Sequence, residues 1–235
     1  TTKKVTLFTY NVGVFSKYTD DSTPAVADLI AAAGADIAAL NELDSCNRRH
    51  NVHQLEALAD ILGGRNHHFA SAISFAGGSY GNGIVTKDGI SSSYKLMLPV
   101  FDGSESRSVA VVETKDYVFA STHLDHKGEY AGVEQARIIN KWFEQRYSGE
   151  SRPVFLCGDM NSRPDGTAVG VLLEKWDNIS GDAPTYPSDS PRSCIDYIFC
   201  LKSARPIISA DAVLLSSADI SSVSDHLPVV VSVSY

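Results

Sequence analysis

The 235-residue sequence has no apolar run that approaches the roughly 20 residues needed to span a bilayer. It also lacks the basic segment followed by an apolar segment that marks a secretory signal at the start of a chain. It opens on Thr1 instead of Met. That start is compatible with an exported protein whose signal has been removed, and equally with a cytoplasmic protein.

Basic residues are in short supply, since 20 Lys and Arg stand against 28 Asp and Glu, a formal net charge of −8. A broad basic surface that grips a polyanion is therefore not expected. The composition still allows a local positive pocket. It also allows metal sites, because a bound cation neutralises the carboxylates that hold it.

Only four cysteines occur, and their spacing fits no zinc motif. Cys157 and Cys200 lie within or at the end of apolar runs, as small buried side chains do. Cys46 and Cys194 each lie within a few residues of an acidic residue that we place in the candidate site. If those acidic residues converge, the two sulfurs can be near each other, and a disulfide between them would indicate an exported protein.

Hydrophobic residues make up 43% of the chain, which at this length is enough for one large domain or two small ones. The Ser-, Pro- and Asp-rich segment 180–193 has the composition of a domain boundary, but too few residues follow it to form a second core. We therefore expect one domain over residues 1–235, and a monomer.

Apolar patterns predict alternating strands and helices in the first part of the chain. Strands are expected at 5–10 and 36–40, and helices at 23–34 and 54–62. Each of these two strands is followed by a polar residue.

The middle of the chain changes character. Four strand-like segments follow one another without a helix and predict an antiparallel meander, at 84–86, 94–98, 108–114 and 117–121. The remaining expected elements are a helix at 132–146, a strand at 154–157, a helix at 169–174 and strands at 195–199, 212–215 and 229–233. Many strands in mixed order with interleaved helices predict two packed mixed sheets with helices outside them.

Polar residues suited to binding a metal or a phosphate stand at the ends of apolar strands, at Asn11, Glu42, His123, the segment 158–161 and the pair Asp225-His226. Asp196 lies one residue inside another strand, where a carboxylate is costly to bury unless it is paired. Capping of the local backbone explains one such placement but hardly six in one chain. Carboxylates and amides without a Cys or His cluster favour a hard cation such as Mg²⁺, Mn²⁺ or Ca²⁺ over zinc.

These residues carry a resemblance to a known family. In chain order the shared motifs are Asn11 after Thr-Tyr, Glu42, Arg107, Thr122-His123, Gly158-Asp159-Met160-Asn161, Ile195-Asp196-Tyr197 and Ser224-Asp225-His226. The chain resembles the endonuclease/exonuclease/phosphatase superfamily, which includes DNase I, abasic-site endonucleases, neutral sphingomyelinases and inositol polyphosphate 5-phosphatases. The segments 80–85 and 122–126 are most similar to small bacterial members of unassigned substrate. The resemblance implies a DNase I-like, four-layer α/β sandwich of two packed mixed β-sheets flanked by helices.

The resemblance implies a metal site. Glu42 is similar to the principal metal ligand of the family, Asn11 would hold the metal or its water, and Asp225 would add a second carboxylate. Mg²⁺ is the implied cofactor, with Mn²⁺ or Ca²⁺ as alternatives.

The resemblance also implies catalytic roles. Asp159 would activate or orient the attacking water, and Asn161 would hold a phosphate oxygen. His226 would contact the phosphate or shuttle a proton, with Asp196 fixing its tautomer. The alternative for Asp196 is a buried ion pair with an arginine.

Further residues have two interpretations each. His123 would donate to the phosphate oxygen on which charge develops. Arg107 would clamp the phosphate, or else pair with Glu105 or Glu42. Three further residues would line the substrate pocket, or else would stabilise the turns and loops in which they lie: Asn82, Asp125 and His126.

The chain departs from two named subfamilies. Gly13 stands where the abasic-site nucleases carry an Asp that shares the metal, which puts a second metal in doubt. Phe101 stands roughly where those enzymes place a phosphate-contacting tyrosine. The segment 193–196 replaces the Pro-x-Trp-Cys-Asp-Arg run of the 5-phosphatases.

The implied function is metal-dependent hydrolysis of a phosphodiester or phosphomonoester by in-line attack of water, without a covalent intermediate. Basic residues near the proposed site are few, which favours a phosphorylated small molecule or a lipid headgroup as substrate: they are Arg48, Arg49, Lys127 and Arg163. One alternative is a DNase I-like or abasic-site-like nuclease acting on DNA or RNA, which should carry basic and aromatic loops. A minor alternative is a non-catalytic binding module on the same fold.

Overall fold

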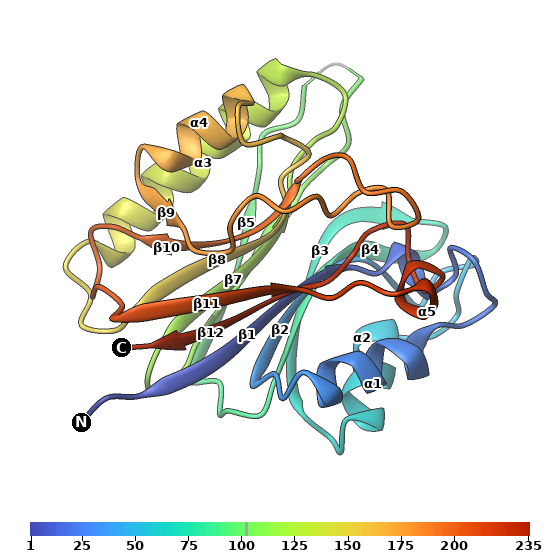
Figure 1. The fold of residues 1–235 in the computed structure, drawn as a ribbon. Helices are drawn as coiled ribbons and strands as arrows, with labels where there is room; N and C mark the ends of the chain where they lie inside the picture. Colours follow the sequence, from blue (N-terminus) through green and yellow to red (C-terminus); the bar gives the residue numbers. More distant parts are fainter. Residues whose placement is uncertain (102) are drawn as a thin grey trace.

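Two six-stranded mixed sheets pack face to face in the computed structural model, which describes residues 1–101 and 103–235 (Figure 1). Helices cover the outer face of each sheet, so the chain forms four layers. This arrangement is the α/β sandwich that was predicted from the sequence.

The first sheet has the strand order β11-β12-β1-β2-β4-β3. Its strands are β1 (Lys4–Asn11), β2 (Ile37–Ser45), β3 (Asn66–Phe75), β4 (Gly78–Thr86), β11 (Ser209–Leu214) and β12 (Val229–Ser234). β1 runs parallel to β2 and antiparallel to β12. The carboxyl ends of β1 and β2 therefore lie at the same edge as the start of β12.

The second sheet has the strand order β5-β6-β7-β8-β10-β9. Its strands are β5 (Ser92–Met97), β6 (Ser108–Glu113), β7 (Val118–His123), β8 (Val154–Asp159), β9 (Trp176–Asn178) and β10 (Asp196–Leu201). β7 is parallel to β8, with His123 opposite Asp159, and β10 is antiparallel to β8, with Asp196 opposite Asp159. Three predicted site residues are thus side by side at one edge of this sheet.

The helical elements are η1 (Gly13–Phe15), α1 (Thr23–Ala32), α2 (Gln54–Ile61), α3 (Glu129–Tyr147), α4 (Thr167–Leu173) and α5 (Ala218–Ser221). α1 and α2 pack on the first sheet, whereas α3 and α4 pack on the second (Figure 1). None of these helices, within the residues that the structure describes, is long and apolar enough to cross a membrane.

Alternation along the strands divides the core into three apolar layers. In β1, Leu7 packs between the two sheets and Phe8 packs toward α1 and α2. In β8, Phe155 packs between the sheets and Leu156 packs toward α3 and α4. All four side chains are fully buried. The central strands therefore carry apolar residues on both faces, which explains their continuous apolar runs.

The structure corrects the predicted meander at its first strand. Residues 84–86 end β4, which pairs with β2 and β3 in the first sheet. The antiparallel meander is β5-β6-β7 alone. β3 and the three-residue β9 were not predicted. β3 is an edge strand with polar residues such as His67 and His68 beside Phe69, so its sequence lacks a clean apolar alternation.

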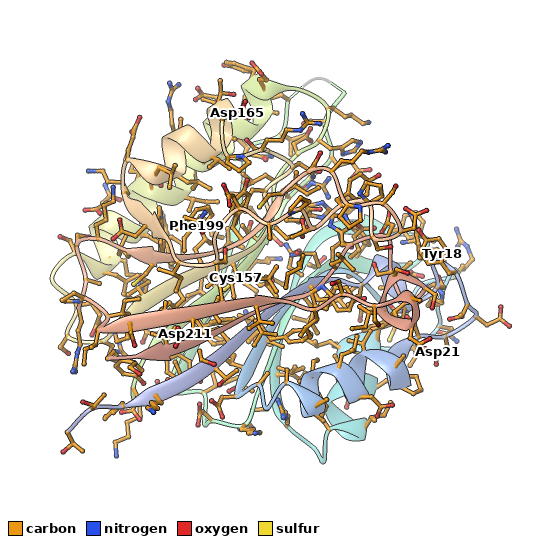
Figure 2. The ribbon with its side chains drawn as sticks, in the orientation of Figure 1. Tyr18, Asp21, Cys157, Asp165, Phe199 and Asp211 are labelled. Atoms are coloured by element: carbon orange, nitrogen blue, oxygen red, sulfur yellow. The ribbon has the colours of Figure 1, made fainter. Side chains whose placement is uncertain are left out.

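All four cysteines lie in the described part of the chain, and all four are free. Cys46 is exposed whereas Cys194 is buried, and the disulfide considered from the sequence is not formed. Cys157 and Cys200 are buried between the two sheets, as predicted. Figure 2 shows Cys157 near the middle of the molecule.

Candidate active site

The predicted site residues converge on one cavity of about 470 Å³. They come from β2, from the ends of β7 and β8 and from loops that precede β6 and β12, so both sheets contribute. The predicted residues that line the cavity are Glu42, Arg107, His123, His126, Asp159, Asn161, Asp225 and His226. Asn11 and Asp196 lie beneath them and contact the lining through hydrogen bonds.

Asn11, at the end of β1, joins two carboxylates of the cavity. Its Nδ2 donates to Glu42 Oε2 at 2.5 Å and to Asp159 Oδ2 at 3.1 Å. Its Oδ1 accepts from the backbone N–H of Gly13 at 3.1 Å. Two like charges are thus held close to one buried amide, an arrangement that a nearby cation would stabilise.

A bulge in β2 presents Glu42 to the cavity. The pairing of β2 with β4 shifts register between Leu40 and Leu43. Glu42 lies within this bulge and has a left-handed φ of +59°. For a residue other than glycine that conformation costs on the order of 1 kcal/mol. The strain is located at the residue that the family resemblance assigns to the metal.

Asn41, which the sequence analysis did not single out, ties the two sheets together beneath the cavity. Its Nδ2 donates to the carbonyl of Thr122 at 2.8 Å and to Asn82 Oδ1 at 2.9 Å. Its Oδ1 accepts from the backbone N–H of Asp159 at 3.1 Å. Asn82 in turn donates to the carbonyl of Ser108 at 2.9 Å. The structure therefore places Asn82 outside the lining of the cavity, where it supports Asn41, and its substrate contact stays a prediction.

His226 lies between two carboxylates. Its Nδ1 is 2.8 Å from Asp196 Oδ2, and its Nε2 is 3.5 Å from Asp159 Oδ2. Asp196 Oδ2 also accepts from the hydroxyl of Thr185 at 2.5 Å. The buried partner of Asp196 is therefore the histidine, and the alternative of an arginine partner is wrong.

Burial and charge oppose each other in this group. Burial disfavours the charged form of His226, but the carboxylates of Asp196 and Asp159 outweigh it and raise the pKa of His226 from 6.5 to about 10. Burial would likewise raise the pKa of Asp159, yet His226 and His123 hold it well below its ordinary value. Burial raises the pKa of Asp196. At neutral pH we expect an imidazolium at His226 beside an ionised Asp159.

His123 and Asn161 complete the polar floor of the cavity. His123 Nε2 lies 3.3 Å from Asp159 Oδ2. Asn161 has a φ of +45°, and its backbone N–H donates to Asp159 Oδ1 at 2.9 Å. Its Nδ2 donates to the carbonyl of Leu124 at 2.9 Å. Both oxygens of Asp159 are therefore engaged, which fixes the orientation of the carboxylate.

Arg107 is 2% exposed and occupies the inner wall of the cavity. Its Nη2 lies 3.1 Å from Glu105 Oε2, so one of the two predicted pairings is observed. The guanidinium also lies 3.3 Å from ring nitrogens of His123 and His126.

Asp225 lines the cavity and forms an ion pair with a lysine. Its Oδ2 lies 3.2 Å from the Nζ of Lys17, a residue that the sequence analysis did not single out. Burial opposes the charge on Lys17, but Asp225 outweighs it and raises the pKa of the lysine. Because Lys17 is about half exposed, the pair is weak and readily opened.

Asp125 shapes the loop that follows β7. Its carboxylate accepts from the backbone N–H of Glu105 at 2.9 Å and from that of Lys127 at 2.6 Å. Asp125 is buried and does not line this cavity, but it lines a neighbouring cavity of about 410 Å³ together with His126 and Asn161. The structure therefore shows the loop role that the sequence left open, and the substrate contact of Asp125 stays a prediction.

The donor groups indicate whether a metal would fit. Ligand atoms of Glu42, His123 and Asp159 lie within 4.8 Å of one another, as do those of Asp159, Asp196 and His226. In the second group both nitrogens of His226 are next to carboxylates, which is an acid–base arrangement. The first group offers two carboxylates and an imidazole, and carboxylate oxygens are the ligands that hard cations prefer. A divalent cation such as Mg²⁺ fits this first group.

The remaining wall is largely apolar and aromatic, and it was not predicted. Its members are Val14, Ile73, Phe75, Tyr80, Tyr186 and Ile195. Arg49 joins this wall, with its guanidinium 4.6 Å from the ring centre of Phe75. Asp44 holds Arg49 through two hydrogen bonds of 2.7 and 2.8 Å. Phe75 was missed because β3, which carries it, was not predicted.

Comparisons with known proteins agree with this architecture. The model of the Endonuclease/Exonuclease/phosphatase family matches residues 8–226. No curated protein matches the chain.

Three solved structures illustrate the likeness of fold. An endonuclease/exonuclease/phosphatase from Beutenbergia cavernae DSM 12333 is 20% identical, with a TM-score of 0.77 over 98% of this chain and 71% of that chain. A mannosyl-6-phosphatase from Bacteroides thetaiotaomicron VPI-5482 is 18% identical, with a TM-score of 0.72 over 97% of this chain and 98% of that chain. The human nocturnin catalytic domain with bound sulfate is 19% identical, with a TM-score of 0.74 over 98% of this chain and 93% of that chain.

Proposed function

The chain belongs to the endonuclease/exonuclease/phosphatase family, and from that premise we propose that it is a divalent-metal-dependent hydrolase of phosphoester bonds. The observation that carries the proposal is the position of Asp159. One oxygen of its carboxylate is within reach of Asn11, His123 and His226 on the floor of a single cavity. Groups that can position water, donate protons and neutralise charge therefore surround the space for one phosphate.

Glu42 and Asp159 would hold the metal, with Asn11 beside them. Asp225 would become a further metal ligand when its ion pair with Lys17 opens. When bound, the cation would stabilise the charge that develops on the phosphate oxygens. The proposed ion is Mg²⁺, with Mn²⁺ or Ca²⁺ as alternatives.

Asp159 orients the attacking water. Its oxygens are fixed by the backbone N–H of Asn161 on one side and by Asn11 on the other. Because its pKa is held well below the ordinary value by His226 and His123, it is a weak base. We therefore assign it the placement of the water in line with the bond that breaks, and not early removal of a proton.

His226 is the proton donor. A pKa of about 10 keeps it protonated at neutral pH. Asp196 accepts from Nδ1, which leaves the proton on Nε2 for a phosphate oxygen or for the leaving group. Asn161 is placed to donate to the same phosphate, whereas the Nε2 of His123 lies against Asp159.

The proposed substrate is a phosphorylated small molecule or a lipid headgroup. Aromatic side chains such as Phe75, Tyr80 and Tyr186 line the cavity, and a ring or a short apolar group packs well on such a wall. The net charge of −8 does not favour a long polyanion. A mannosyl-6-phosphatase has the same fold, so sugar phosphates are natural first candidates.

An activity panel tests this proposal. The purified chain is assayed with Mg²⁺, Mn²⁺, Ca²⁺ or a chelator against sugar phosphates, inositol phosphates, sphingomyelin, plasmid DNA and RNA. We expect metal-dependent release from a small phosphoester or a lipid headgroup. Cleavage of DNA or RNA alone would make the protein a nuclease. A lack of any turnover, together with a lack of metal binding by calorimetry, would overturn the proposal in favour of a binding module.

A further inference from the structure

Arg107 contacts two histidines of the cavity at once. Its Nη1 lies 3.3 Å from Nδ1 of His123, and its Nη2 lies 3.3 Å from Nδ1 of His126. Nη2 is also 3.1 Å from Glu105 Oε2. One buried guanidinium therefore joins the loop before β6 to both histidines at the end of β7 and in the loop beyond it.

The chemistry of the guanidinium decides where the protons of these histidines lie. An arginine side chain has five N–H donors and no acceptor. Each Nδ1 that Arg107 contacts must therefore accept a hydrogen bond, and so it carries no proton. A neutral imidazole with an accepting Nδ1 carries its proton on Nε2.

The second contact of His123 agrees with this assignment. Its Nε2 lies 3.3 Å from Oδ2 of Asp159, which is an acceptor. Arg107 thus donates to one nitrogen of the ring, and the other nitrogen donates to a carboxylate. Both nitrogens are committed, so His123 has no lone pair left for a metal, although it lies close to Glu42 and Asp159.

The Nε2 of His126 is the ring nitrogen that Arg107 does not contact. Its Nδ1 accepts from Arg107, and its side chain lines the same cavity as His123. The Nε2–H of His126 is therefore a hydrogen-bond donor with no acceptor assigned to it in the described residues. Phosphate oxygens are acceptors and suit such a donor.

We propose that Arg107 is a positioning residue that holds His123 and His126 as Nε2–H tautomers. His123 then donates to Asp159 instead of binding the metal, and His126 presents a donor to the substrate phosphate. The catalytic meaning of this inference rests on the proposed function, whereas the tautomers do not depend on it. Arg107 then acts through the two histidines. Its Nε has no hydrogen-bond partner among the described residues, so the phosphate clamp considered from the sequence is the alternative that the variants below test.

NMR of the ¹⁵N-labelled full chain tests the tautomers directly. Long-range ¹H–¹⁵N spectra distinguish a protonated ring nitrogen from an unprotonated one. The variants His123→Gln and His126→Gln assign the two signals among the seven histidines. We expect a proton on Nε2 and none on Nδ1 in both residues, with and without Mg²⁺. A proton on Nδ1 of either residue, or loss of the Nε2 proton of His123 when Mg²⁺ is added, would overturn the proposal.

Variants of Arg107 separate positioning from direct phosphate contact. Arg107→Met should shift the tautomer equilibrium of His123 and lower kcat by about 10- to 100-fold, as loss of an orienting partner does. Arg107→Lys keeps donors at this position and should restore part of the tautomer equilibrium and part of kcat. Arg137→Met, at an exposed arginine of α3 outside the cavity lining, is the matched control that should change neither. Loss of activity in Arg107→Met with both tautomers unchanged would identify a phosphate clamp. If Arg107→Met does not fold, the wild-type spectrum still decides. Inactivity on every substrate would contradict the proposed function but would not affect the tautomer assignment.

Discussion

The Nδ1 of His226 lies 2.8 Å from Oδ2 of Asp196, and both side chains are more than nine-tenths buried. A carboxylate at this depth is strongly disfavoured unless a partner compensates its charge. Thr185 donates a second hydrogen bond to the same oxygen, whereas Oδ1 of Asp196 has no hydrogen-bond partner among the described residues. The imidazolium of His226 is therefore the main compensation for this carboxylate.

Replacing Asp196 with Asn should lower the pKa of His226. Asp196 is foremost among the groups that raise this pKa to about 10, and an asparagine has no charge with which to do so. NMR titration of His226 in the metal-free protein measures the change, and we expect the pKa to fall toward 6.5. Turnover at neutral pH should fall with it, because His226 loses its proton. An unchanged pKa would mean that Asp159 alone sustains the imidazolium.

The same pair should make the metal-free protein less stable in alkali. The pKa of His226 is raised in the folded state from 6.5 to about 10, so folding favours the protonated form. This contribution is fully present below about pH 6.5 and is lost as the pH rises through about 10. The free energy of unfolding in urea should decline between these values in the wild type, and less so in His226→Gln. Equal declines would contradict the assignment.

Removing the side chain of Asn41 should destabilise the junction between the sheets. Asn41→Ala leaves the N–H of Asp159 and the carbonyl of Thr122 without their partner. Each buried group left unpaired costs about 1–3 kcal/mol, so we expect a loss of roughly 2–5 kcal/mol in urea unfolding. Asn51→Ala is the matched control, since Asn51 is exposed, and it should change stability by less than about 0.5 kcal/mol. A loss no larger than that of the control would show that the junction does not depend on this amide.

Arg49 should contribute to substrate binding and not to the chemical step. It lines the cavity beside Phe75, and Asp44 holds it in place. For a substrate from the activity panel we expect Arg49→Ala to raise KM about tenfold, the effect of losing one charge-assisted contact of about 1.5 kcal/mol, with kcat nearly unchanged. Arg48→Ala, at the exposed neighbouring position outside the cavity lining, is the control. A fall in kcat with constant KM would place Arg49 in the chemical step instead.

The sequence predicted two packed mixed sheets because many strands in mixed order are interleaved with helices, and the family resemblance implied the four-layer sandwich. Its apolar strands also end in polar residues. Asn11, Glu42 and Asp159 were found in this way, because a strand that ends in a carboxylate or amide is visible in a single sequence. The bulge that turns Glu42 into the cavity was not visible, since a left-handed φ leaves no mark in the residue type.

Contacts between distant segments account for the other misses. Lys17 pairs with Asp225 across most of the chain, and no local pattern connects them. The supporting role of Asn82 depends on its distance from Asn41 in the folded chain, which the sequence does not contain. Tyr186 lies in a loop whose composition reads only as irregular, so its place on the cavity wall required coordinates.

The rate of phosphoester hydrolysis by Glu42→Gln and His226→Ala tests the central claim most directly. Both side chains line the cavity, whereas Glu174 and His67 are exposed elsewhere and supply the matched controls Glu174→Gln and His67→Ala. With Mg²⁺ present, the account predicts that each site variant stays folded by circular dichroism and loses at least about 100-fold in turnover, while both controls retain it. Wild-type rates in both site variants would contradict the account, because the cavity would then not be where the reaction occurs.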